Sequence, residues 1–158
     1  MISDPDEERA CLASLPRSAR LMGLDLGTKT IGIAISDVER RIASPVETIR
    51  RTKFGKDAAA LLALAERHSI GAFVLGLPVN MDGTMGPRVQ ATTAFARNLA
   101  KLTTLPILCQ DERLSTAAVT RTLIEADTSR ARRAELVDKM AAAYLLQAFI
   151  DRFSGSRF

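Results

Sequence analysis

The architecture of the chain can be predicted from one segment, Leu21-Met22-Gly23-Leu24-Asp25-Leu26-Gly27-Thr28-Lys29-Thr30-Ile31-Gly32-Ile33-Ala34-Ile35-Ser36-Asp37. Its first part is apolar apart from one glycine and Asp25. Its last part alternates isoleucines with small residues, at the period of two that is typical of a strand. A polar turn, Gly27-Thr28-Lys29-Thr30, separates the two parts. The segment therefore predicts a β-hairpin in which Asp25 is the unexpected residue.

Asp25 has two interpretations. A carboxylate in a buried strand is costly unless its charge is compensated. A divalent metal ion would compensate it, and hard oxygen ligands suit magnesium or manganese. Alternatively, Asp25 caps the turn through its own backbone, as aspartate often does. The hairpin alone leaves both interpretations open.

Length and composition indicate a single globular domain with a sizeable core. The chain has 158 residues, of which 47% are hydrophobic and 25% charged. Aromatic residues make up 4%, so binding of single strands by stacking on several aromatic platforms is not expected. The net charge of +4 favours a polyanionic partner such as nucleic acid.

The cysteines and the N-terminal segment predict a cytoplasmic protein that does not bind membranes. Cys11 and Cys109 have no metal-ligand spacing and suit a reducing compartment, with Cys109 expected as a buried thiol. No apolar run has membrane-spanning length, and the acidic N-terminus lacks the apolar region of a secretory signal. Residues 1–19 are predicted to be a flexible extension with a short helix around 7–15, and residues 20–158 the domain.

The remaining pattern predicts a mixed α/β sheet. A third strand at 40–49 follows the hairpin, and Pro45 makes it an edge or irregular strand. Strands then alternate with helices, which implies parallel pairing through right-handed crossovers. The expected strands are 72–77 and 105–110, the expected helices are 54–68, 88–102, 116–125 and 134–153, and the expected polar or basic loops are 78–87 and 126–133.

Two further acids have positions that suggest function. Glu112 follows a predicted parallel strand, at the sheet edge where open α/β sheets place their sites. A solvated charged turn is the alternative. Asp138 shares a helical stripe with Ala141, Ala142 and Leu145, which should face the sheet. A boundary residue in the first helical turn is the alternative there.

If Asp25, Glu112 and Asp138 converge, they form an all-oxygen site for one or two divalent ions. Such ions activate water for attack on a phosphodiester and stabilise the leaving oxygen, so no nucleophilic side chain is needed. His68, the one histidine, is expected at the surface and not as a catalytic base.

Basic residues near these acids are candidates for contacts with a nucleic-acid backbone. For each one alone, a solvated surface charge is the alternative. The candidates are Lys29, Arg88, Arg113, Arg132 and Arg133. A second cluster around the third strand, which the sequence does not place clearly near the acids, contains Arg40, Arg41, Arg50, Arg51 and Lys53.

Five motifs in this order resemble the YqgF family, also called RuvX, of bacterial Holliday-junction resolvases and pre-16S ribosomal RNA nucleases. The resemblance covers about residues 20–153. The motifs are Gly23-Leu24-Asp25-Leu26-Gly27-Thr28-Lys29-Thr30-Ile31-Gly32-Ile33-Ala34, Gly76-Leu77-Pro78-Val79-Asn80-Met81-Asp82-Gly83-Thr84, Gly86-Pro87-Arg88, Asp111-Glu112-Arg113-Leu114-Ser115-Thr116 and Val137-Asp138-Lys139-Met140-Ala141-Ala142.

The resemblance implies a ribonuclease-H-like fold, a five-stranded mixed sheet with helices on both faces. It also implies that Asp25, Glu112 and Asp138 form the active site with magnesium or manganese. Polar motif residues complete the expected nucleic-acid contacts, namely Asn80, Ser115 and Thr116. Related resolvases often carry a fourth acid one turn after the last aspartate, where this chain has Ala141.

The function expected first is a metal-dependent nuclease, a hydrolase that processes the 5′ end of pre-16S ribosomal RNA in ribosome biogenesis. Holliday-junction resolution in DNA recombination and repair is the alternative. An actin-like or sugar-kinase-like ATP-binding domain also uses an Asp-x-Gly-Thr hairpin, but it needs a second such hairpin. A catalytically silent RNA-binding module is the third possibility. The sequence does not decide the oligomeric state.

Overall fold

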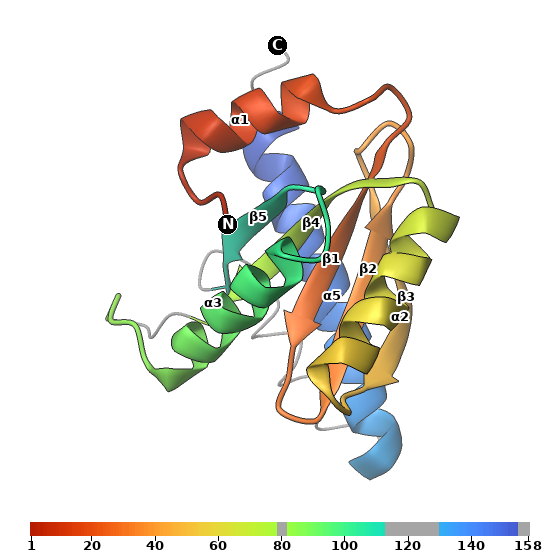
Figure 1. Cartoon of the computed structure of the whole chain (residues 1–158), viewed down its shortest axis with the longest axis vertical. Coiled ribbons are helices and arrows are strands. Elements are labelled where there is room, and N and C mark those ends of the chain that lie inside the picture. The colour runs from red at the N-terminus through yellow and green to blue at the C-terminus, as the bar shows by residue number, and fades with distance from the viewer. Residues whose placement is uncertain (79–81, 113–129, 155–158) are drawn as a thin grey trace.

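The computed structural model describes residues 1–78, 82–112 and 130–154, with the side chains of residues 130–138 left out. In chain order the elements are α1 (Pro5–Ser14), β1 (Arg20–Leu26), β2 (Thr30–Ser36), β3 (Ala43–Arg50), α2 (Phe54–Arg67), β4 (Ile70–Leu77), α3 (Pro87–Ala100), β5 (Ile107–Asp111) and α5 (Arg130–Ser154). The strands form one sheet in the order β3-β2-β1-β4-β5, with helices on both faces (Figure 1). The pairs β1–β2 and β2–β3 are antiparallel, whereas β1–β4 and β4–β5 are parallel, so the predicted mixed sheet is confirmed.

The predicted hairpin forms the centre of this sheet. Every residue of β1 after Arg20 is buried, and so is every residue of β2 after Thr30. The amide of Gly27 donates to the carbonyl of Thr30 at 2.9 Å and closes the turn. The described residues contain this one sheet, and so they hold no second hairpin of the kind that the ATP-binding alternative requires.

β3 is the edge strand that Pro45 predicted. Its pairing with β2 shifts register between Ile33 and Ala34, where Pro45 lies opposite Ala34. Proline has no amide hydrogen to give to a ladder, so a regular pairing cannot continue through it.

The sheet separates two hydrophobic cores. Side chains alternate across a strand, so β1 contributes to both. Met22, Leu24 and Leu26 pack toward α2 and α3, whereas Leu21 packs toward α5. Asp25 therefore belongs to the face that α5 covers.

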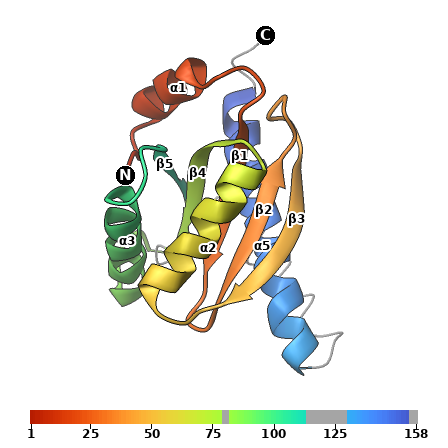
Figure 2. The same ribbon diagram turned by 45° about the vertical axis from the view of Figure 1, so that its right-hand side comes forward.

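α5 lies close against its face of the sheet. A Cβ atom added to Gly23 would be 2.8 Å from Cβ of Leu146 and 3.0 Å from the carbonyl oxygen of Ala142, so only glycine permits this approach. Further along the helix, Phe149 lines a cavity together with Leu21. α5 thus runs antiparallel to β1, as Figure 2 shows.

The C-terminal part of the chain corrects one boundary. α5 begins at Arg130 and not at the predicted Ala134, so the last four residues of the predicted loop at 126–133 are helical. These four residues are arginine and alanine, which favour helices and so explain the earlier start. The predicted helix at 116–125 lies outside the described residues. No helix in the described part of the chain is long and apolar enough to cross a membrane.

Residues 1–19 form contacts that their polar composition did not predict. The short helix expected around 7–15 is α1, but the segment is packed against the domain and does not project from it as a free extension. Ile2 forms a parallel bridge with Leu108 at the edge of β5, and its amide donates to the carbonyl of Ile107 at 2.7 Å. Glu8 is fully buried, with Oε2 3.2 Å from Nη2 of Arg152 in α5.

Candidate active site

Asp25 is the buried acid from which the site is built. It is the second-last residue of β1, is 2% exposed and lies opposite Gly32 in β2. Its neighbours Leu24 and Leu26 face the core beneath α2 and α3, so its carboxylate lies on the face beneath α5. The same strand pattern that builds the core therefore places an acid under the last helix.

Glu112 reaches the same face from two strands away. A Cβ atom added to Gly76 in β4 would be 2.6 Å from Oε1 of Glu112 and 2.9 Å from Cδ2 of Leu145 in α5. The Glu112 side chain therefore folds back over β4 and occupies the space beside a residue that has no side chain.

The strand register brings Asp25 to this place. Leu24 pairs with Leu75, so the next residues along the two parallel strands, Asp25 and Gly76, lie side by side. Neighbouring strands are about 4.8 Å apart. Because Gly76 has no side chain, the Glu112 carboxylate can lie over β4, beside the strand that carries Asp25.

For Asp138 the structure describes the position of the backbone and not that of the side chain. It lies in α5 one turn before Ala142, whose carbonyl oxygen lies over Gly23. Because α5 runs antiparallel to β1, one turn back along the helix, about 5.4 Å, leads from Gly23 toward Asp25. The backbone at position 138 therefore lies at the Asp25 end of β1, while its side chain is outside the described part.

The residues that are described fit a hard divalent cation. Their donors are carboxylate oxygens, which magnesium and manganese prefer, and the absence of a side chain at Gly76 lets the Glu112 carboxylate lie over β4 next to β1. Among the described residues no group of three potential ligands is assembled, since the third acid lies beyond the described side chains. The trio of Asp25, Glu112 and Asp138 as metal ligands remains a prediction.

The predicted basic contacts divide into two groups. Lys29 lies exposed in the hairpin turn and Arg88 lies exposed at the start of α3. Both belong to the carboxyl edge of the sheet, near β1. The backbone of Arg132 and Arg133 belongs to α5, but their side chains are not described. The other candidates lie outside the described residues, namely Asn80, Arg113, Ser115 and Thr116.

The structure adds Arg51, which the sequence left in a separate basic cluster. Its amide donates to the carbonyl of Lys29 at 2.8 Å, and its Nη1 donates to the carbonyl of Gly27 at 2.7 Å. It lines a small cavity of about 70 Å³ together with Arg88 and Thr28. β1, β2 and β3 form an antiparallel meander, so the end of β3 lies beside the β1–β2 turn. The three successive strands are the sequence signal from which the position of Arg51 beside that turn could have been predicted.

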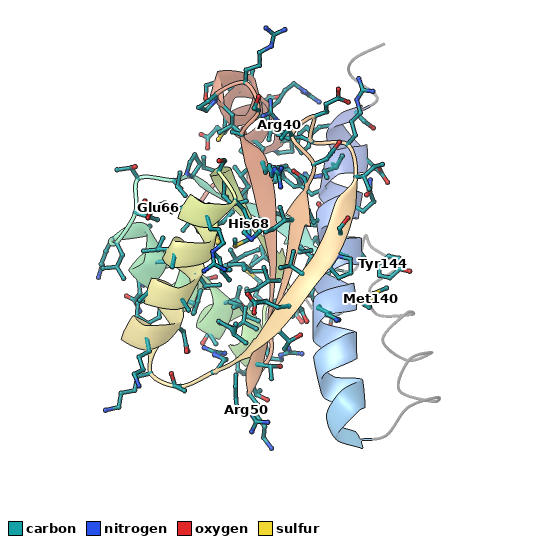
Figure 3. All side chains as sticks on the ribbon, turned by 90° about the vertical axis from the view of Figure 1, so that its right-hand side faces the viewer. Arg40, Arg50, Glu66, His68, Met140 and Tyr144 are labelled. Carbon is teal, nitrogen blue, oxygen red and sulfur yellow. The ribbon has the colours of Figure 1, made fainter. Side chains whose placement is uncertain are left out.

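The other reactive side chains lie away from the acids or are chemically quiet. His68, labelled in Figure 3, follows α2 and lines a cavity with the first residues of β1 and β4, whereas Asp25 lies near the other end of β1. Cys109 is the predicted buried thiol, and burial raises its pKa to about 12. A thiol with such a pKa stays protonated at neutral pH and is a poor nucleophile.

Known proteins resemble the chain over nearly its whole length. The family model RuvX, described as "Holliday junction resolvase", matches residues 19–152. A Paramagnetospirillum magneticum protein named "Putative pre-16S rRNA nuclease" is 64% identical over 144 residues, 91% of this chain and 93% of that protein. A Cereibacter sphaeroides protein of the same name is 59% identical over 152 residues, 96% of this chain and 94% of that protein.

Solved structures show the same fold at low sequence identity. The RuvC structure of Thermus thermophilus covers 84% of this chain and 95% of its own, with a TM-score of 0.53 and 16% identity. RuvC from the same organism in complex with a Holliday junction substrate gives a TM-score of 0.52 over 86% of this chain and 96% of its own, also at 16% identity. At this identity the likeness concerns the fold alone.

Proposed function

The chain belongs to the RuvX family, and on that premise we propose that it is a divalent-metal-dependent nuclease that hydrolyses phosphodiester bonds in nucleic acid. The observation that carries the proposal is the buried carboxylate of Asp25 beside Gly76, with the carboxylate of Glu112 folded over that glycine. A binding module for phosphates gains nothing from carboxylates gathered at one sheet edge, because they repel the ligand.

Each acid has a separate part in the proposed mechanism. Asp25, Glu112 and Asp138 would hold magnesium or manganese, which when bound activates water and stabilises the leaving oxygen. Asp25 is fixed by the central strand, so it supplies the rigid member of the set. Glu112 follows β5 and reaches over Gly76 with a longer side chain, so it supplies the adjustable member.

The basic residues near the carboxyl edge would orient the substrate. Lys29, Arg51 and Arg88 surround the β1–β2 turn, which follows Asp25 directly. Arg51 is held against the carbonyl of Gly27, and its guanidinium lies 5.7 Å from the centre of the Phe95 ring. A guanidinium fixed in this way is ready to bind a backbone phosphate without losing much further freedom.

The substrate that we propose first is the 5′ precursor segment of 16S ribosomal RNA. It is supported by the names of relatives that are 59–66% identical to this chain. A four-way DNA junction is the second candidate, because the family model carries that description. We further propose that the protein acts in the cytoplasm, where ribosomal RNA precursors are processed in bacteria.

The proposal is tested by cleavage of three substrates with magnesium, manganese or chelator. They are a ribosomal RNA precursor, a four-way DNA junction and an unstructured RNA of equal length. We expect metal-dependent cleavage of the precursor, and a loss of at least ~100-fold in Asp25→Asn, since losing even an outer-shell partner of a metal ligand costs about 10- to 100-fold. Glu7→Gln, which removes an exposed carboxylate on α1, is the matched control and should cleave like the wild type. Equal cleavage by Asp25→Asn and the wild type refutes the proposed site.

A further inference from the structure

A second basic region lies at the end of the central strands that is opposite the acids. A cavity of about 550 Å³ opens where β1 and β4 begin, between the loop that precedes β1 and the end of α2. Arg17 and Arg20 line it from the loop side, and Arg67 and His68 line it from the helix side. Its volume falls within the range of ligand sites. Nothing in the proposed nuclease chemistry uses these residues.

The described residues that line this cavity include three arginines and no carboxylate. The guanidinium groups of Arg17, Arg20 and Arg67 form no hydrogen bond or ion pair with any residue that the structure describes. Arg40 and Arg51, by contrast, donate to backbone carbonyls at 2.7 Å. Three free guanidinium groups around one cavity produce a local positive potential that attracts anions.

α2 connects this cavity to the catalytic edge. Figure 2 shows the helix crossing the face of the sheet, and its 14 residues span about 21 Å. Lys53 precedes its first turn and Lys56 lies within that turn, both exposed, while Arg67 ends it. Between Lys56 and Arg67 the exposed residues are three alanines and one acid, namely Ala59, Ala60, Ala63 and Glu66. In Figure 3, His68 marks the cavity end of α2, and Arg50 marks the opposite edge of the sheet.

We propose that the cavity is a second contact for the phosphate backbone of the nucleic-acid substrate, reached along the outer face of α2. This inference rests on the proposed nuclease function, which it deepens by specifying the substrate. Basic residues at both ends of α2, and the short alanine side chains between them, allow a polyanion to lie along the helix. The arginines of the cavity would bind phosphates and would not read the bases. The cavity therefore selects for size and structure and not for sequence.

The separation of the two sites sets a minimum substrate. Arg20 and Asp25 are five residues apart in β1, which is about 17 Å at 3.3 Å per residue. B-form DNA at about 3.4 Å per step would need about five base-pair steps to cover that distance, and an A-form RNA stem, which rises less per base pair, needs more. Substrates with longer stems should engage both sites, whereas shorter ones should engage the acids alone.

The test compares two double variants with equal charge change. Arg17→Gln/Arg67→Gln neutralises two cavity arginines. Arg97→Gln/Lys101→Gln neutralises two exposed residues at the end of α3, outside the cavity. Binding to a hairpin RNA with a stem of 12 base pairs is measured over a series of salt concentrations. To keep the RNA intact, every protein carries Asp25→Asn, and thermal unfolding shows whether each variant is folded.

We expect the slope of log K against log salt to fall by about one per cavity arginine, and to stay unchanged in the control. In proteins with Asp25 intact, the cavity variant should raise KM for the long stem with kcat unchanged, and leave cleavage of a three-base-pair stem unaffected. An unchanged slope, or equal effects on short and long stems, overturns the inference while the nuclease proposal stands. Absence of metal-dependent cleavage by the wild type refutes the nuclease proposal, whereas the salt slopes still report on the cavity.

Discussion

Replacing Gly76 by alanine should strongly reduce the rate of cleavage while lowering the stability of the fold only modestly. The added Cβ would lie 2.6 Å from Oε1 and 3.1 Å from Cγ of Glu112, and 2.9 Å from Cδ2 of Leu145. These atoms belong to side chains that can rotate, so the fold can accommodate the methyl group. The Glu112 carboxylate must move by about 0.8 Å to reach an ordinary contact of 3.4 Å.

The magnitudes of the two effects differ. Overpacking costs about 1–3 kcal/mol, and alanine in a strand returns about 0.5–1 kcal/mol relative to glycine. For a protein of this size, 1 kcal/mol changes Tm by about 2–4 °C, so the loss in Tm should not exceed about 10 °C. A catalytic group misplaced by about 1 Å can lower the rate ~100-fold. We therefore expect a folded protein with strongly reduced cleavage.

The assay measures kcat on the cleaved substrate, the metal concentration at half-maximal activity, and Tm. Gly55→Ala is the matched control, because no atom lies within 4 Å of the position of its added Cβ. Gly55 lies in the first turn of α2, so alanine there should leave activity unchanged and keep or raise Tm. Normal kcat and metal dependence in Gly76→Ala would show that Glu112 does not act beside this glycine.

Three further predictions concern stability and thiol chemistry. Gly23→Ala should lower the free energy of unfolding by about 1–3 kcal/mol in chemical denaturation, because its Cβ would be 2.8 Å from Cβ of Leu146 and 3.0 Å from helix backbone that cannot rotate away. Burial raises the pKa of Glu8 above its ordinary value of 4.5 despite the opposing charge of Arg152, so the folded protein holds this proton more tightly than the unfolded chain. The contribution of Glu8 to stability is therefore largest below pH 4.5 and falls as pH rises through the folded pKa, and Glu8→Gln should gain stability relative to the wild type between pH 4 and 7 in urea titrations. Cys109 should stay unlabelled by a thiol reagent at pH 8 in the folded protein, since its pKa is about 12, and should react once the chain is unfolded.

Local periodicity explains what the sequence could predict. The alternation of Ile31, Ile33 and Ile35 identifies a strand without knowledge of its neighbours, and Pro45 limits where β3 can lie in the sheet. Asp25 stood out because it interrupts an apolar strand. The placement of Asp25 and Glu112 on one face then follows from the register of parallel strands, which the alternation of strands and helices had indicated.

Contacts between distant residues explain what the sequence could not predict. Glu8 and Arg152 are 144 positions apart, and nothing in their neighbourhoods indicates that they meet. Arg51 reaches the hairpin turn because the meander folds back, which only the three-dimensional arrangement reveals. Arg17 and Arg67 are 50 positions apart in the chain, so the sequence alone does not bring them to one cavity.

The bridge between Ile2 and β5 has a consequence for handling the protein. An exposed sheet edge offers unpaired backbone groups to other chains and promotes aggregation. Ile2 covers the β5 edge at Ile107 and Leu108. At the other edge, which β3 forms, the backbone amide of Ala43 donates to Oε1 of Gln147 in α5 at 2.8 Å. Shortening the chain at its first residues should therefore cost solubility as well as stability, and an affinity tag is better attached at the C-terminus.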